Sequence, residues 1–269
     1  MAAQSIHTRA IPWENGEIYE TYAGRWSRKV AVELLKWLAV KPEAAWLDVG
    51  CGSGALTHTI LQVARPASVK AVDLSKNFVV YCQEHIIDPR ASFEVGDALA
   101  LPVESGSFDA VVTGLMLNFV PQPEQALLEM KRAARPGGVV AAHVWDYSGR
   151  MQLIRLFWNA AVAVDPTAYD LDEGNRFPIC KPDRLVELFS KAGLSEVQVQ
   201  SIDIWTEFTN FDDLWAPFLG GQGPAPAYCN SLDTRRRNAL RERLRSSLPV
   251  ALDGSIPLMA RAWAVRGTN

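Results

Sequence analysis

The sequence predicts an α/β protein with a doubly wound, mostly parallel sheet of seven strands and helices on both faces. Three observations support this prediction. Strand and helix patterns alternate from about residue 45 to residue 147, a glycine-rich loop joins the first strand of that region to its first helix, and aspartates stand at or near the ends of its first three strands. Strands that alternate with crossover helices form parallel sheets, because each crossover helix packs back onto a face of the sheet.

The alternating region contains five short apolar runs that we interpret as strands. They cover residues 45–49, 69–73, 91–95, 108–113 and 139–145. Helical patterns between them cover residues 55–64, 76–87 and 122–134. Ser75 is a residue type that caps helix N-termini, so the second of these helices should begin there. Pro136, Gly137 and Gly138 should force a turn before the fifth strand.

The segments on either side of this region are less regular. A helical segment is expected over residues 17–39. After residue 147, helical patterns cover 151–164, 183–192 and 233–248, and strand patterns cover 196–205 and 256–265. Residues 215–226 hold too many glycines and prolines for regular structure.

We therefore expect a single domain over residues 1–269. Its core should comprise residues 40–147, 181–207 and 253–266. The remaining segments, 148–180 and 208–252, are interpreted as insertions that form a cap.

Composition argues against several classes of protein. A chain of 269 residues can bury a sizeable core without disulfides or metals. Its net charge is −3 and no basic block dominates, so nucleic acid is not expected as a partner. The four cysteines form no CxxC pair, which disfavours a metal site and fits a cytoplasmic protein. No uncharged apolar run approaches the roughly 20 residues that span a bilayer.

A glycine-rich loop, residues 48–54 (DVGCGSG), follows the first strand and opens the first helix. Glycines allow a tight turn and let a ligand approach the backbone, and the free N–H groups at the start of a helix face that ligand. Gly50, Gly52 and Ala55 fit the dinucleotide-binding fingerprint. Asp73 stands where that fingerprint places an acid for ribose hydroxyls. The loop and Asp73 therefore predict an adenosine-type cofactor without deciding which one.

Two further aspartates favour S-adenosylmethionine over a nicotinamide dinucleotide. Asp48 stands at the mouth of the loop, where a carboxylate would repel a pyrophosphate but attract the positive charges of S-adenosylmethionine. Asp97 follows the third strand and could accept a hydrogen bond from an adenine amino group. Each acid alone could equally be a loop or helix cap. Three acids at successive strand ends favour ligand binding, because parallel sheets bind ligands at their carboxyl edge.

Five segments of the chain stand in an order that is specific as a set. They are 46–54 (WLDVGCGSG), 72–75 (VDLS), 96–102 (GDALALP), 107–112 (SFDAVV) and 135–138 (RPGG). This set resembles the motifs of class I S-adenosylmethionine-dependent methyltransferases, over about residues 20–147. The resemblance is strongest to the small-molecule, "type 11" branch that includes quinone-biosynthesis enzymes. It implies a Rossmann-like sheet, S-adenosylmethionine as the cofactor and S-adenosylhomocysteine as the product.

The resemblance also implies roles for matching residues. The cofactor-binding residues that it implies are Tyr22, Arg25, Asp48, Gly50, Cys51, Gly52, Asp73, Leu74, Asp97, Ala98, Thr113, Leu115 and Asn118. The glycine loop would line the methionine portion, Asp73 would bind the ribose hydroxyls and Leu74 would pack on adenine. Asp97 and Ala98 would address the adenine edge.

The other implied roles concern the methionine end of the cofactor. Thr113 would offer its carbonyl to the ammonium group, and Leu115 and Asn118 would lie near the sulfonium. The segment that contains Tyr22 and Arg25 would close over the cofactor. Arg25 could pair with the methionine carboxylate, although an exposed helix arginine is an equal alternative.

Methyl transfer from a sulfonium is an in-line displacement, so alignment and exclusion of water can supply much of the rate. Side chains that could contribute to catalysis are Asn118, Asp146, Tyr147, His58 and His143. His often occupies the place of Asn118 in related sequences, so an obvious base is missing here. Asp146 and Tyr147 stand at the carboxyl end of the fifth strand. His143 lies inside that strand and is interpreted as a core histidine with satisfied hydrogen bonds.

We expect the methyl acceptor to be a small, largely apolar molecule in a closed pocket. Residues 22–26, Asn118, Trp145 and residues 211–228 should bound that pocket, because the last segment mixes aromatic residues with glycines and prolines. Two other functions stay open: an NAD-dependent oxidoreductase on a similar sheet, and a non-catalytic S-adenosylmethionine-binding protein. The sequence does not determine the acceptor, the attacked atom or the oligomeric state.

Overall fold

The structure is a computed structural model that describes residues 25–220 and 223–269. Seven strands form one sheet. They are β1 (Ala45–Val49), β2 (Ser68–Asp73), β3 (Ala91–Val95), β4 (Phe108–Gly114), β5 (Ala134–Trp145), β6 (Ser195–Phe208) and β7 (Ile256–Thr268). Their order in the sheet is β3-β2-β1-β4-β5-β7-β6. The first five strands pair in parallel, and β7 is antiparallel to both of its neighbours.

The centre of the sheet is covered on both faces. Leu47, Val49 and Val111 are completely buried. A run of buried residues without alternation is typical of a parallel strand between two layers of helices. The predicted mostly parallel, seven-stranded α/β fold is therefore confirmed.

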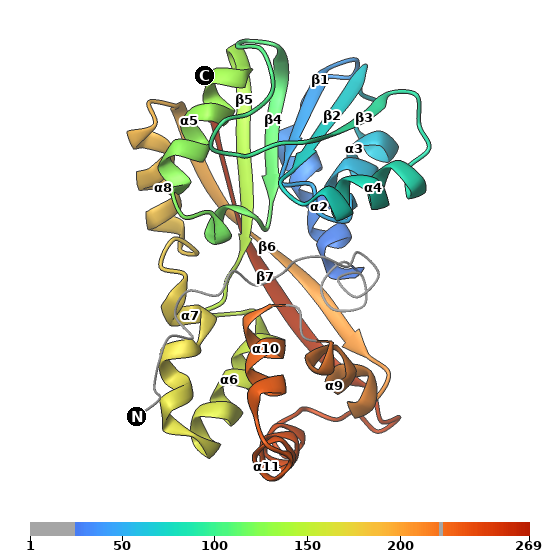
Figure 1. Ribbon diagram of the computed structural model, residues 1–269, viewed down its shortest axis with the longest axis vertical. Coiled ribbons are helices and arrows are strands. Elements are labelled where there is room, and N and C mark those ends of the chain that lie inside the picture. The colour runs from blue at the N-terminus through green and yellow to red at the C-terminus, as the bar shows by residue number, and fades with distance from the viewer. Residues whose placement is uncertain (1–24, 221–222) are drawn as a thin grey trace.

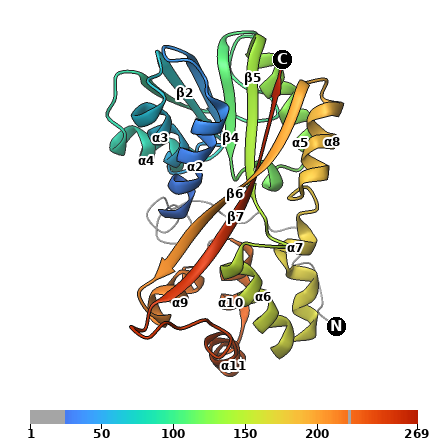
Figure 2. The same ribbon diagram turned by 180° about the vertical axis from the view of Figure 1, so that it is seen from behind.

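Five helices pack on this sheet. They are α2 (Arg25–Leu38), α3 (Ala55–Val63), α4 (Lys76–His85), α5 (Pro123–Ala133) and α8 (Pro182–Lys191). α2 packs on α3 and β6, whereas α5 packs on β4 and β5. Figures 1 and 2 show α2 and α5 on opposite sides of the sheet. Ser75 caps α4 as predicted, because its hydroxyl accepts a hydrogen bond from the Phe78 amide.

The N-terminal helix was expected over residues 17–39. The structure describes it from Arg25, and residues 17–24 lie outside the described residues. Val30, Leu34 and Leu38 are buried at helical spacing and face the core.

A second group of helices surrounds the far half of β6 and β7 (Figures 1 and 2). It comprises α6 (Gln152–Val164), η3 (Pro166–Leu171), α7 (Glu173–Arg176), α9 (Phe211–Leu219), α10 (Pro224–Ser231) and α11 (Thr234–Arg245). β7 pairs with β5 only from Ala262 onward, and its residues 256–261 pair with β6 alone. The two long strands therefore leave the sheet as a ribbon, on which these helices, the cap, are built.

The expectation that residues 215–226 lack regular structure is wrong. They belong largely to α9 and α10. The Asn210 side chain caps α9 by accepting a hydrogen bond from the Asp213 amide, and Pro224 occupies the first turn of α10, where no N–H donor is needed.

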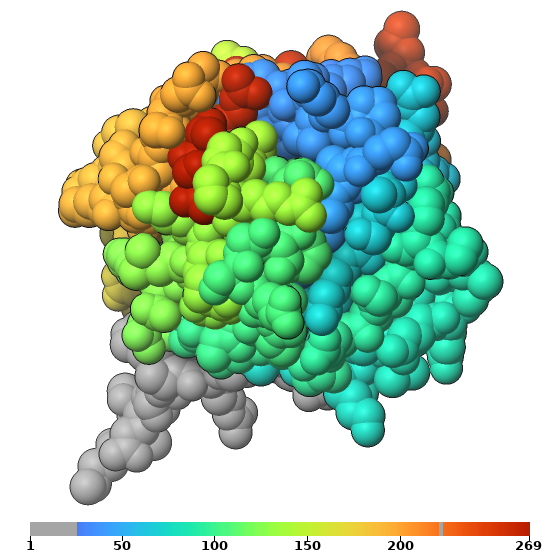
Figure 3. Space-filling model, turned by 90° about the horizontal axis from the view of Figure 1, so that it is seen from above, coloured from blue at the N-terminus to red at the C-terminus, as the bar shows by residue number. Residues whose placement is uncertain are grey.

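The expected turn at Pro136, Gly137 and Gly138 is also corrected. These residues lie within β5, as an irregularity between the pairs Phe108–Ala134 and Ala110–Val139. The last residue of the chain holds this bulge, since Asn269 exchanges backbone hydrogen bonds with Gly137 and Gly138. Figure 3 shows the end of β7, in red, beside this yellow-green segment.

Candidate active site

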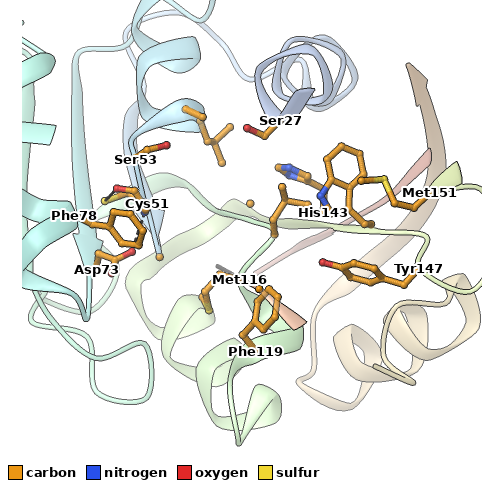
Figure 4. A pocket seen from close by; sticks show the side chains of 18 of the residues that line it. Ser27, Cys51, Ser53, Asp73, Phe78, Met116, Phe119, His143, Tyr147 and Met151 are labelled. Atoms are coloured by element: carbon orange, nitrogen blue, oxygen red, sulfur yellow. Dashed lines mark hydrogen bonds between the residues drawn. The ribbon is translucent and has the colours of Figure 1, made fainter. Parts of the chain in front are cut away.

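A pocket lies where the carboxyl ends of the parallel strands meet the cap. Its lining residues are Ser27, Asp48, Gly50, Cys51, Gly52, Ser53, Ala55, Leu56, Asp73, Phe78, Gly114, Leu115, Met116, Phe119, His143, Trp145, Tyr147, Met151, Leu153, Ile154, Glu173, Gly223 and Pro224. Figure 4 shows Cys51, Asp73 and Phe78 on one side and His143, Tyr147 and Met151 on the other. We call these the cofactor end and the cap end of the pocket.

The glycine loop forms the wall of the cofactor end. The amides of Gly50 and Cys51 both donate to the Val72 carbonyl, so the loop turns back over β2. The Gly52 amide donates to Asp73 Oδ2 at 2.8 Å, and the Ser75 amide donates to Asp73 Oδ1 at 2.8 Å. Burial raises the pKa of Asp73, and these two hydrogen bonds oppose the shift. Asp73 therefore joins the loop to the end of β2.

Asp48 is completely buried beneath this loop. Its Oδ2 accepts a hydrogen bond of 2.6 Å from the Thr57 hydroxyl, and its Oδ1 has no partner within the described chain. Burial raises the pKa of Asp48 to about 7, against the effect of the Thr57 hydrogen bond. A buried carboxyl oxygen without a donor is costly and indicates a site for a cationic or hydrogen-bonding group.

The floor of the pocket is a strained turn at the end of β4. Leu115 has a φ of 60°, in the left-handed region that side chains disfavour, and its amide donates to the His143 carbonyl at 2.8 Å. Such strain persists only where the surroundings impose it, and it clusters at functional sites. Met116 follows and packs closely against Gly50, where an added Cβ would come within 2.5 Å of Met116 Cγ.

His143 is not the satisfied core histidine that we expected. It lines the pocket, its side chain is buried, and neither ring nitrogen has a partner among the described residues. Burial lowers the pKa of His143 to about 4, so the ring is neutral at neutral pH. The strand pattern predicted that this residue would be buried, but not that a pocket would open beside it.

The cap end of the pocket is mostly apolar. Trp145 is the last residue of β5 and Tyr147 follows it, whereas Met151 is the N-cap residue of α6 and Ile154 lies in its first turn. A buried carboxyl group, Glu173, stands among them. Its Oε2 accepts a hydrogen bond from the Trp158 indole at 2.5 Å. Burial raises the pKa of Glu173 to about 7, although the Trp158 hydrogen bond opposes this shift.

Several predicted cofactor residues do not line the pocket. Leu74 is 71% exposed beside Asp73. Asp97 is exposed, and its Oδ1 accepts a hydrogen bond from the Leu99 amide, as in a local loop cap. Ala98 and Thr113 are also outside the lining.

The remaining predicted residues are distributed as follows. Asn118 lies next to the lining residue Phe119, and its side-chain nitrogen and oxygen are buried without partners in the described chain. The Asp146 carboxylate accepts a hydrogen bond from the Arg150 amide and closes a turn instead of lining the pocket. Tyr22 lies outside the described residues, and Arg25 begins α2, but its side chain is also outside them.

Other lining residues were not found from the sequence. They include Ser27, Ser53, Phe78, Met116, Phe119, Met151, Leu153, Ile154 and Glu173. Ser53 had a local signal, because it belongs to the glycine loop. Met116 and Phe119 follow the predicted Leu115 and Asn118, and Ser27 follows the predicted segment 22–26. Residues such as Phe78, Ile154 and Glu173 reach the pocket through packing of segments that are distant in sequence.

Neither a membrane-spanning helix nor a cluster of metal-binding side chains occurs in the described residues. No helix within residues 25–220 and 223–269 is long and apolar enough to cross a membrane. The same residues contain no group of three or more His, Cys, Asp and Glu side chains that could hold a metal ion.

The fold and the site together define a class of protein: an α/β fold with a pocket at the carboxyl edge of its sheet, the edge where parallel sheets bind ligands. Residues 47–142 match the family model described as "Methyltransferase domain". A demethylmenaquinone methyltransferase of Lysinibacillus sphaericus is 31% identical over 180 residues, which are 61% of this chain and 76% of that protein. One from Roseiflexus castenholzii is 33% identical over 174 residues, covering 59% and 71%. The chain belongs to the S-adenosylmethionine-dependent methyltransferases.

Solved structures agree on the fold. The YcgJ protein of Bacillus subtilis superimposes with a TM-score of 0.56 at 16% identity, covering 91% of this chain and 98% of that one. A phosphoethanolamine N-methyltransferase 2 of Haemonchus contortus, in complex with phosphomonomethylethanolamine and S-adenosylhomocysteine, gives a TM-score of 0.59 at 16% identity, covering 95% and 57%. The predicted methyltransferase family is thus confirmed, and the comparisons favour it over an NAD-dependent oxidoreductase.

Proposed function

We propose that this methyltransferase binds S-adenosylmethionine at the cofactor end of the pocket and methylates a small, largely apolar molecule at the cap end. The observation that carries the proposal is Asp48 Oδ1, which is buried beside the glycine loop without a partner in the described chain. The ammonium group of S-adenosylmethionine would supply the missing donor. The pyrophosphate of NAD would instead meet a carboxylate.

The residues of the cofactor end suit the rest of that molecule. Gly50, Cys51 and Gly52 present backbone to the methionine portion, and the space beyond Gly52 is open, with no atom within 4 Å of an added Cβ. Asp73 keeps lone pairs for ribose hydroxyls beyond the two amides that it binds. The exposed Leu74 is available to pack on adenine. Asp97, Ala98, Thr113, Asn118, Tyr22 and Arg25 remain predictions on which this proposal does not depend.

When bound, S-adenosylmethionine supplies a methyl group on a positively charged sulfur. The chain must align an acceptor atom behind that methyl group and keep water away. The apolar wall of Trp145, Met151 and Ile154 serves both purposes. His143 is neutral and unpaired within the described chain, so it can exchange a hydrogen bond with the acceptor without adding a charge.

A small acceptor fits the shape and composition of the cap end, since small-molecule sites are concave and mostly apolar with few polar anchors. Two relatives are named for demethylmenaquinone, which supports an apolar acceptor. The net charge of −3 gives no support for nucleic acid as a substrate. The four cysteines are free and buried, which supports a reducing compartment such as the cytoplasm.

Calorimetric titration tests the cofactor assignment. S-adenosylhomocysteine, the expected product, should bind with one site per chain, and NAD should give no heat beyond dilution. Tight binding of NAD without any response to S-adenosylhomocysteine would falsify the proposal.

A further inference from the structure

Glu173 brings a carboxyl group into the apolar, cap end of the pocket. It lies on α7, lines the pocket and is 2% exposed. Its Oε2 is occupied by the Trp158 indole, whereas its Oε1 accepts no hydrogen bond from the part of the chain that the structure describes. Unlike Asp48 Oδ1, this oxygen is not sealed off by the protein, so it stays accessible from the pocket and can accept a hydrogen bond from a ligand there.

Trp158 holds this carboxyl group in one orientation. The tryptophan is completely buried in α6, with its ring 5.2 Å from that of Phe157 and 5.4 Å from that of Tyr228. An indole has a single N–H donor, so it can satisfy only one oxygen of Glu173. The oxygen left over belongs to a residue that lines the pocket.

Neighbouring charges do not satisfy Glu173 either. Arg155 forms its ion pair with Asp172, and Asp172 also accepts the Gly174 amide. Arg155 and Arg176 lower the pKa of Glu173 by less than burial raises it, and Asp172 raises it further. A buried carboxyl group without an ion pair does not stabilise the folded protein, so ligand binding better explains why Glu173 stands in this pocket.

We propose that Glu173 determines acceptor specificity: its free oxygen accepts a hydrogen bond from a hydroxyl or amino group of an otherwise apolar methyl acceptor. This inference rests on the proposed function and adds the chemical class of the acceptor to it. A buried acceptor selects strongly for a ligand that carries the donor, because a ligand without it leaves the polar group unpaired.

The other buried ionisable groups of the pocket are less suited to this role. Asp48 stands at the cofactor end under the glycine loop. His143 packs against Gly114 at the floor, within 2.7 Å of where a Cβ on that glycine would lie, and its neutral ring is a weaker acceptor than a carboxylate. Glu173 is the group that the cap contributes.

The substitution Glu173→Gln tests the hydrogen bond between the free oxygen of Glu173 and the methyl acceptor. Glutamine keeps the volume and one carbonyl oxygen, which the Trp158 indole occupies. The amide nitrogen then replaces the free oxygen, so an acceptor becomes a donor. Binding of S-adenosylhomocysteine and circular dichroism should be unchanged, because Glu173 does not contact the cofactor end.

The experiment compares three probes on the full chain saturated with S-adenosylhomocysteine: 2-naphthol, 2-naphthylamine and 2-methoxynaphthalene. At pH 8.5, above the pKa of about 7 given for Glu173, the wild type should bind 2-naphthol or 2-naphthylamine at least tenfold more tightly than the ether, as expected for one hydrogen bond to a charged group. Glu173→Gln should lose this discrimination and bind the ether as the wild type does. The two donor probes show whether a hydroxyl or an amino group is preferred.

Two further variants complete the test. Glu104→Gln, at an exposed position outside the pocket, should discriminate like the wild type. Trp158→Phe removes the donor that orients Glu173 and should reduce discrimination at least threefold. The inference fails if the wild type does not discriminate, if no probe binds, or if Glu173→Gln behaves like the wild type. Failure of S-adenosylhomocysteine to bind would instead contradict the proposed function.

Discussion

Asp48 combines complete burial with an incomplete set of hydrogen bonds. Its folded-state pKa, about 7, lies above the ordinary value of 3.8. A carboxyl group with a raised pKa binds its proton more tightly in the folded state than in the unfolded state. The resulting loss of stability is absent below about pH 4, grows as the pH rises to about 7 and is complete above it.

Asp48→Asn should therefore stabilise the free protein at pH 8 and have little effect below pH 4. The scale is about 1.4 kcal/mol for each unit of difference between the folded and unfolded pKa values. Thermal unfolding of both proteins at several pH values measures it. The same variant should bind S-adenosylhomocysteine more weakly at pH 8, because the partner of the ammonium group is lost. A variant that is both less stable and unimpaired in binding at pH 8 would contradict our assignment of Asp48.

Gly52 stands where the glycine loop faces the open pocket. Its φ of 52° disfavours a side chain, and an added Cβ would meet no atom within 4 Å. Gly52→Val should abolish binding of S-adenosylhomocysteine while the fold is retained, because the side chain would occupy the space of the methionine portion. Calorimetry measures the binding and circular dichroism checks the fold. Wild-type affinity in the folded variant would count against the loop as the cofactor site.

At the scale of single elements, α9 shows how a cap residue decides where a helix begins. Asn210 accepts a hydrogen bond of 3.0 Å from the Asp213 amide. Asn210→Ala should reduce the free energy of unfolding by about 1 kcal/mol, the usual contribution of an N-cap. Asn210→Asp keeps an acceptor oxygen and should retain wild-type stability. Urea denaturation compares the three proteins, and equal stability of the alanine variant would show that α9 does not depend on this cap.

Elements with strong local signals were predicted well. β1 was predicted at its observed residues, 45–49, because its run of apolar residues is short and bounded by a glycine loop. α9 and α10 were missed because the many glycines and prolines of residues 215–226 were taken to exclude regular structure. Pro224 is at the start of a helix, and Pro217 lies in the last turn before Gly220. Proline is least disruptive near a helix start, and buried residues such as Leu214 and Phe218 supply the stabilisation that propensity lacks.

At the scale of the whole molecule, β6 and β7 join the core to the cap. Trp26 of α2 packs edge-on against Phe208 at the far end of β6, with ring centroids 5.6 Å apart. Buried residues of the sheet and of the cap, such as Val111 and Phe218, belong to one continuous hydrophobic cluster. The two parts therefore share strands and a core, and neither is expected to unfold alone.

Scanning calorimetry should accordingly show one unfolding transition. S-adenosylhomocysteine should shift this whole transition to higher temperature, because a ligand that binds only the folded state stabilises the entire cooperative unit. Two separate transitions, with only one shifted by the ligand, would show that core and cap are independent.

The sequence by itself determined the fold class, the glycine loop, the position of Asp73 at the end of a strand and the methyltransferase family. These are local properties: strand and helix periods, glycines in a turn and acids at strand ends all lie within a few residues of one another. Asp48 and Cys51 line the pocket as predicted, because both belong to the glycine loop, which is a local feature of the sequence.

Only the tertiary structure decided which segments face one another across the pocket. His143 and Glu173 are 30 positions apart, Ser27 and Gly223 come from near opposite ends of the chain, and all four line one cavity. Asp97 and Asp146 had the right chemistry and position along the chain, but the nearby Leu99 and Arg150 amides hold their carboxylates in local turns. The partner that a polar side chain takes depends on the burial and pairing of distant segments, which no local pattern records.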